Sequence, residues 1–118
     1  MMPYERFEAW RLCHRLVLAV YRVTSRFPPD ERYGLTAQAR RAAFSAAANI
    51  VEGSAKRGRR EFGRYLDTAV GSLSELSYIF RLASDLRLLS EADAAELQQL
   101  HTDASRVTWG LYSAVRKQ

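Results

Sequence analysis

The most constraining feature of the sequence is a row of apolar residues that recurs at alternating intervals of four and three. Its members are Phe62, Leu66, Ala69, Leu73, Leu76, Phe80 and Ala83. An α-helix places such residues on one face, whereas a half-buried strand would alternate every second residue. The same spacing returns in Leu97, Leu100, Ala104, Val107, Leu111 and Ala114. The sequence therefore predicts long amphipathic helices and no sheet.

Turn-forming residues divide the chain into four helical segments. Two consecutive prolines in FPPDERYG remove backbone donors and end the first segment. Thr36 is the expected N-cap of the second segment, and Gly53 can end it by taking a left-handed conformation. Gly58 or Ser54 caps the third segment, and Ser90 caps the fourth, where SEADAAEL places acids in the first turn. The predicted helices span about residues 4–26, 36–53, 59–85 and 91–117.

Short connections between long helices favour an all-α, antiparallel up-down-up-down four-helix bundle that occupies residues 1–118 as a single domain. The second helix is thin on its apolar face, which lets a neighbouring backbone approach closely; this face holds Ala39, Ala42, Ala43, Ala46 and Ala47. The first and third helices carry apolar residues beyond one stripe. This surplus indicates either a wide core face or a surface that another copy covers, and we expect a homo-oligomer.

The residue types that carry catalysis or bind metals are not arranged for either purpose. Neither His14 nor His101 lies three residues after a glutamate, as a carboxylate-bridged metal site in a bundle would require. The single cysteine, Cys13, lies on the apolar stripe of the first helix and is interpreted as a small buried side chain. We therefore expect no enzymatic activity, no metal and no cofactor. The absence of long apolar runs and of a signal-peptide pattern predicts no membrane association and a cytoplasmic location.

Several polar residues fall inside the apolar pattern and predict a structural cluster. Glu75 follows the apolar row of the third helix, and Asn49 and Glu52 lie one turn apart just before Gly53. A carboxylate at a partly buried position needs a cation or several donors. We expect these groups to meet one of two arginines in a hydrogen-bonded lock at Gly53, the cation coming from Arg40 or Arg41. A small-molecule or metal pocket on these carboxylates is the alternative.

Positive charge is concentrated in the first half of the chain. Residues 1–60 hold twelve Lys/Arg and five Asp/Glu, or +7, whereas residues 61–118 hold six and eight, or −2, which sums to +5. One face of the first helix carries Arg11, Arg15, Arg22 and Arg26. A second cluster holds Lys56, Arg57, Arg59, Arg60 and Arg64. Cations at a helix start oppose the macrodipole, so this placement favours contact with nucleic-acid phosphates over a purely local role. A solvated basic face with scattered ion pairs is the alternative.

Motifs along nearly the whole chain resemble one known family. They are the Trp10 region, FP…ERYGLT, RRA…S..ANI.EG, EF.RYL and GSL.EL. The chain resembles the bacterial four-helix bundle proteins that are encoded in intervening sequences of 23S ribosomal RNA genes. It departs from their pattern in the second helix, where Ala46 and Ala47 replace Ile-Pro and Phe44 replaces a smaller aliphatic residue.

The resemblance implies a cyclic homo-oligomer, with a pentamer as the expected state. It also implies kinship with the accessory variability proteins of diversity-generating retroelements, which bind nucleic acid and a reverse transcriptase through basic surfaces. Two functions follow as expectations. The first is a non-enzymatic, oligomeric accessory protein that binds RNA or DNA through the two basic clusters. The second is an interaction scaffold whose basic surface binds an acidic protein partner such as a reverse transcriptase.

Overall fold

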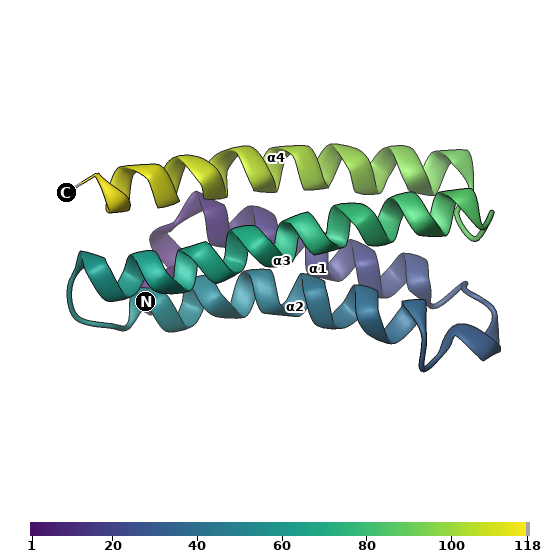
Figure 1. Ribbon diagram of the computed structural model, residues 1–118, viewed down its shortest axis with the longest axis horizontal. Helices are drawn as coiled ribbons and strands as arrows, with labels where there is room; N and C mark the ends of the chain where they lie inside the picture. Colours follow the sequence, from purple (N-terminus) through teal and green to yellow (C-terminus); the bar gives the residue numbers. More distant parts are fainter. Residues whose placement is uncertain (118) are drawn as a thin grey trace.

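The computed structural model describes residues 1–117, and within them the chain forms four α-helices and no strand (Figure 1). The elements, in chain order, are η1 (Pro3–Arg6), α1 (Glu8–Thr24), η2 (Pro29–Glu31), α2 (Leu35–Ser54), α3 (Arg59–Asp85) and α4 (Glu91–Arg116), where η marks a short 3-10 helix. The predicted all-α four-helix fold is confirmed. Among the described residues, no helix combines the length and apolar character that spanning a bilayer would require.

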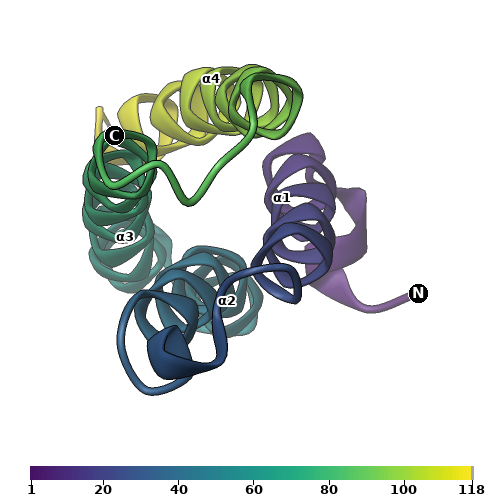
Figure 2. The same cartoon turned by 90° about the vertical axis from the view of Figure 1, so that its right-hand side faces the viewer.

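The four helices run antiparallel to their sequence neighbours and enclose one core. Seen end-on, they follow one another around the core in chain order, so that α1 packs against both α2 and α4 (Figure 2). The bundle measures 44 × 23 × 22 Å. The turn at residues 55–58 lies at the same end as the N-terminus and the last turn of α4 (Figure 1). We call this the α2–α3 end; the other two connections lie at the opposite end.

The predicted apolar row of α3 forms its core face. Six of its seven members are buried, and Phe62 is half-buried and packs against the core. The five alanines predicted for the apolar face of α2 are buried as well, each 7% exposed or less. Because alanine projects only one carbon from the backbone, α2 lies close to its neighbours along its length. The core predictions for the second and third helices are therefore confirmed.

Three core positions of α4 lie one residue further along the chain than the apolar pattern predicted, whereas Leu97 and Ala104 are buried as predicted. Its buried residues are Leu97, His101, Ala104, Thr108 and Tyr112, whereas Leu100, Val107 and Leu111 are half-buried and Ala114 is exposed. His101 Nε2 donates to the Leu73 carbonyl oxygen at 2.7 Å, and Thr108 Oγ1 lies 3.5 Å from Cys13 Sγ. Since both polar side chains find partners, their burial costs little, and hydrophobicity alone misplaces this row.

Two helix ends differ from their predictions. Thr36 is buried inside α2, whose N-cap is Gly34; the Glu31 carboxylate accepts from the Leu35 amide at 3.1 Å. Gly53 does not take a left-handed conformation, because α2 continues through it to Ser54. Gly58 has a positive φ of 84° and is the N-cap of α3. Of the two predicted caps, Gly58 and Ser54, the first is therefore confirmed. At the start of α4 the predicted cap is confirmed, since Ser90 Oγ accepts from the Asp93 amide at 3.0 Å.

Candidate nucleic-acid interface

The cations predicted between α2 and α3 are all exposed at the α2–α3 end. Lys56 and Arg57 belong to the turn, and Arg59, Arg60 and Arg64 lie in the first two turns of α3. Arg64 Nε lies 3.4 Å from Glu61 Oε2, one helical turn away. Within residues 1–117, Arg59 and Arg60 form no ion pair. Their charge is therefore available to an anion from solution.

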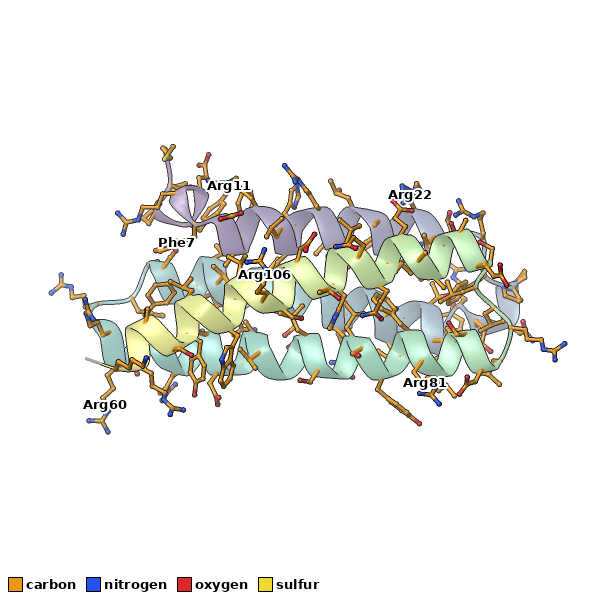
Figure 3. The ribbon with its side chains drawn as sticks, turned by 90° about the horizontal axis from the view of Figure 1, so that it is seen from above. Phe7, Arg11, Arg22, Arg60, Arg81 and Arg106 are labelled. Carbon is orange, nitrogen blue, oxygen red and sulfur yellow. The ribbon has the colours of Figure 1, made fainter. Side chains whose placement is uncertain are left out.

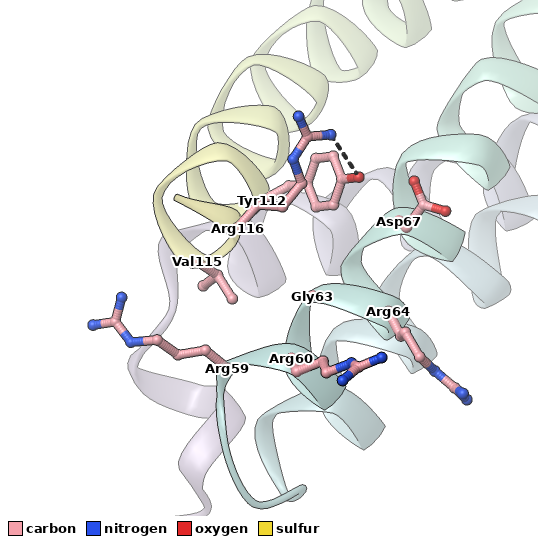
Figure 4. Close-up of a pocket in the computed structure, with 8 residues that line it drawn as sticks. All are labelled: Arg59, Arg60, Gly63, Arg64, Asp67, Tyr112, Val115 and Arg116. Atoms are coloured by element: carbon pink, nitrogen blue, oxygen red, sulfur yellow. Dashed lines mark hydrogen bonds between the residues drawn. The ribbon is translucent and has the colours of Figure 1, made fainter. Parts of the chain in front are cut away.

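A pocket of about 440 Å³ opens between the first turns of α3 and the last turns of α4. It is lined by Arg59, Arg60, Gly63, Arg64, Asp67, Tyr112, Val115 and Arg116 (Figure 4). Val115 and Tyr112 project from α4 toward α3, while the guanidinium groups of Arg59 and Arg64 spread outward on either side (Figure 4). Four arginines and one aspartate give the pocket a strong excess of positive charge. The volume is within the range of pockets that hold small ligands.

Arg116 is a cation of this pocket that sequence reasoning missed. Its Nη1 donates to Tyr112 Oη at 3.2 Å, and its guanidinium lies over the Tyr112 ring, 5.4 Å from the centroid (Figure 4). The hydrogen bond with Tyr112 raises the pKa of Arg116 above its ordinary value, so the group stays charged. Arg116 is 56 residues from Arg60 in the chain (116 − 60), and the antiparallel return of α4 brings the two together. Only the order of helices around the bundle could have indicated it.

The arginine face of α1 divides into two halves with different surroundings. Arg22 forms an ion pair with Glu96, and Arg26 Nη2 donates to Asp93 Oδ2 at 2.7 Å, so both are tied to α4. The hydrogen bond from Arg26 lowers the pKa of Asp93 below its ordinary value of 3.8. Arg11 Nη1 donates to the Glu5 carbonyl oxygen at 2.8 Å, and Arg15 forms no ion pair within residues 1–117. Figure 3 shows that Arg11 and Arg22 lie toward opposite ends of α1.

The predicted polar lock forms only in part. Arg41 Nη2 donates to Glu75 Oε2 at 2.9 Å, which confirms one of the expected pairs between α2 and α3. Arg40 instead donates from Nε to Thr24 Oγ1 of α1 at 3.0 Å. Asn49 Nδ2 donates to the Ser45 carbonyl oxygen in its own helix at 2.8 Å. The prediction of one joint cluster is therefore wrong, because these side chains point from α2 toward different neighbours.

The remaining members of the predicted lock show what holds the α2–α3 hairpin. Glu52 is exposed and makes no hydrogen bond or ion pair through its side chain within residues 1–117. Gly53 is buried, and a Cβ placed on it would lie 2.7 Å from Tyr65 Cβ and 2.9 Å from Phe62 Cδ1. The pair of helices is therefore fixed at this point by close backbone approach. A small hydrogen-bonded link lies further along, where Ser45 Oγ and Ser72 Oγ are 2.8 Å apart.

The chemistry available elsewhere in residues 1–117 is limited. Cys13 is buried, and burial raises the pKa of its thiol to about 11, which keeps it protonated near neutral pH. No three side chains of His, Cys, Asp or Glu in this range gather closely enough to hold a metal ion. What the described surface offers is a cluster of exposed guanidinium groups at one end of the bundle, among which Arg59 and Arg60 have no ion-pair partner within residues 1–117. Such groups bind phosphates and carboxylates.

The fold and the α2–α3 end together define a small all-α four-helix bundle protein with an anion-attracting surface. The family model described as 23S rRNA-intervening sequence protein matches residues 5–110, and the chain belongs to this family. The match runs from η1 through most of α4, so it includes both basic clusters. None of the curated proteins matches the sequence.

Proposed function

We propose that this protein is a non-enzymatic RNA-binding accessory protein that acts in the cytoplasm as a homo-oligomer. The observation that carries the proposal is the arginine-lined pocket between α3 and α4, where Arg59 and Arg60 have no acidic partner within residues 1–117. The family name, which refers to an intervening sequence of 23S rRNA, supports RNA over other polyanions. DNA is the competing nucleic acid, because phosphates are common to both.

The positions of the cations support a polyanion as the ligand. The first turn of a helix carries a partial positive charge from its unpaired amides, so arginines placed there are repelled by their own helix. An anion bound at this end would interact favourably with the amides and the guanidinium groups together. RNA would release condensed counterions on binding, which strengthens the complex at low salt. Contacts of this kind position a strand without reading its bases.

The test is a titration of RNA and of DNA at several salt concentrations. The logarithm of the binding constant should fall linearly with the logarithm of salt. Replacement of Arg57, Arg59 and Arg60 by alanine should reduce the slope by about 2, since each lost phosphate contact removes about 0.7 on a single strand. Arg116→Ala should weaken binding in the same direction as Arg60→Ala, because both side chains line one pocket.

A matched control variant removes three positive charges from outside the α2–α3 end. Arg22, Arg26 and Arg81 are each paired with an acid, and their triple replacement by alanine also lowers the net charge by three. If binding depends on the α2–α3 end, this variant should keep most of the salt dependence. Equal losses in both triple variants would indicate a general charge effect. Absence of binding by the parent protein at low salt would exclude the proposed function.

A protein-interaction scaffold is the second candidate, and exposed apolar side chains favour it. Phe44, Tyr78, Leu86 and Trp109 are each more than half exposed. Trp109 also borders a hollow of about 370 Å³ between α3 and α4. Large exposed aromatic residues are typical of surfaces that another protein covers. We propose a second copy of the chain as the first such partner and an acidic protein, such as a reverse transcriptase, as a further one.

Light scattering tests the assembly directly. A homo-oligomer at micromolar concentration should shift toward the monomer when Tyr78 or Trp109 is replaced by a charged residue. Tyr33, which is 85% exposed in the connection before α2, supplies a control position for the same substitution. A monomeric parent protein would contradict the assembly proposal. The RNA-binding proposal would still be tested independently by the titration.

A further inference from the structure

Three aromatic side chains form a continuous row at the start of α1. The Tyr4 ring, presented by η1, meets the Trp10 ring edge-on at a centroid distance of 4.7 Å and an angle of 65°. The Trp10 ring is stacked on the His14 ring at 5.1 Å and 12°. Residues four apart are neighbours on a helix, and side chains tilt toward its N-terminus, so His14 lies over the turn that holds Trp10. Trp10 is held between two rings and is fixed in orientation.

The row ends in solvent at His14. Tyr4 and Trp10 are half-buried, whereas His14 is exposed. Within residues 1–117, no further aromatic ring stacks on it. An exposed imidazole at the end of a fixed stack presents a flat surface to whatever lies against α1.

An arginine follows each of the two rings of α1, because the sequence here reads WRLCHR. Arg11 comes directly after Trp10 and Arg15 directly after His14, and both are exposed. Consecutive residues differ by about 100° around a helix, so the rings and the guanidinium groups form two parallel rows with a rise of about 6 Å between turns. The pairs formed by Arg22 and Arg26 with α4 are absent from this half of α1. A strand lying along α1 would meet a cation at each of two turns and the free face of His14 at one of them.

We propose that the Tyr4–Trp10–His14 row stacks an unpaired base of a single-stranded nucleic acid on the free face of His14 while Arg11 and Arg15 contact its phosphates. The inference rests on the proposed RNA-binding function and adds the class of ligand. Stacking on aromatic side chains tolerates any base, because every base has a flat π face. In a duplex the base faces are covered by neighbouring pairs, so a duplex reaches the arginines alone. The aromatic row therefore selects single strands over duplexes.

The experiment compares one short single-stranded RNA with the same strand annealed to its complement, at fixed low salt. His14→Ala should weaken single-strand binding by about 5- to 150-fold, the range found when one stacked base loses its partner. Duplex binding should stay within about twofold, because the arginines are unchanged. His14→Phe should restore single-strand binding, since it keeps a ring at the position. Arg15→Ala should weaken both ligands, which separates the loss of a cation from the loss of a ring.

A second measurement follows the row itself. The chain has two tryptophans, so Trp109→Phe leaves Trp10 as the one fluorescent indole. Single-stranded RNA should quench its emission, and the duplex should leave it nearly unchanged. Equal effects of His14→Ala on both ligands, or none on either, would overturn the inference and leave the RNA-binding proposal intact. A change of oligomer mass in His14→Ala would overturn it in favour of a contact between copies. Failure of the parent protein to bind RNA at all would remove both proposals.

Discussion

Gly53 of α2 lies so close to Tyr65 of α3 that no larger residue fits between the two helices. A Cβ on Gly53 would stand 2.7 Å from Tyr65 Cβ, which is shorter than side-chain carbons approach one another. The glycine is the second-last residue of α2, so its intrinsic cost relative to alanine is at most the roughly 1 kcal/mol found in a helix interior. Close packing of the α2–α3 hairpin at this point therefore outweighs helix propensity.

Gly53→Ala should lower the stability of the protein. Relief of the glycine penalty gives at most about 1 kcal/mol, whereas overpacking against Tyr65 costs about 1–3 kcal/mol. We expect a net loss in the free energy of unfolding, measured by urea denaturation. Gly71 is the matched control, because it lies in α3 with open space where its Cβ would go. Gly71→Ala should raise stability by about 0.5–1 kcal/mol, and a gain in both variants would contradict the close approach.

The Arg26–Asp93 pair should make the free energy of unfolding decrease as the pH falls into the acid range. Arg26 lowers the pKa of Asp93 in the folded protein below the ordinary value of 3.8. A depressed folded pKa adds stability that is present above the unfolded value and is lost as pH falls through the folded value. Asp93→Asn should therefore reduce the difference between urea midpoints at neutral pH and below pH 3.8. An unchanged difference in this variant would show that the pair contributes nothing in solution.

The Cys13 thiol should be inert in the folded protein. Burial raises its pKa to about 11, and the thiolate is the reactive form, so a disulfide reagent near neutral pH meets a protonated and inaccessible group. The rate of labelling should rise steeply in denaturant and follow the unfolding transition. Above pH 9.0 the unfolded thiol ionises before the folded one, so stability falls as pH rises from 9.0 to about 11 and stays lower beyond it. Fast labelling of the native protein would contradict the buried position.

The Arg41–Glu75 pair should contribute little to the stability of a single protomer. Both side chains are substantially exposed, at 59% and 43%, and exposed pairs contribute about 0–1 kcal/mol. A double-mutant cycle with Arg41→Ala and Glu75→Ala should give a coupling free energy in that range, which decreases with added salt. A much larger coupling in the assembled protein, but not in a dilute monomeric variant, would place the pair at a contact between copies.

The sequence predicted the helices well where one local signal decided the structure. The bounds of α3 follow from Gly58 and the apolar row, and Ser90 identifies the start of α4. The core face of α4 was predicted only in part, because His101 and Thr108 are buried with partners on other helices. Apolar periodicity cannot identify a buried polar residue whose hydrogen-bond partner is distant in the sequence.

The sequence predicted the cations that the α2–α3 turn and α3 contribute to the candidate site, but not the one that α4 contributes. The turn cations were visible as a run around Gly58, whereas Arg116 joins them through the antiparallel return of α4. The pairs of Arg22 and Arg26 with α4 acids span 74 and 67 residues, so the face of α1 looked uniformly free of acids. Such pairings depend on the order of helices around the bundle, which local patterns do not encode.

The alanine face of α2 has a consequence for how the protein can vary. Five of its eight buried positions hold alanine, the smallest side chain that favours a helix, so larger residues there would push apart two neighbouring helices. The leucines of α3 and α4 can exchange with residues of similar volume at modest cost. In a library of all single substitutions, α2 should therefore appear as the least tolerant helix, although most of its buried side chains are single methyl groups.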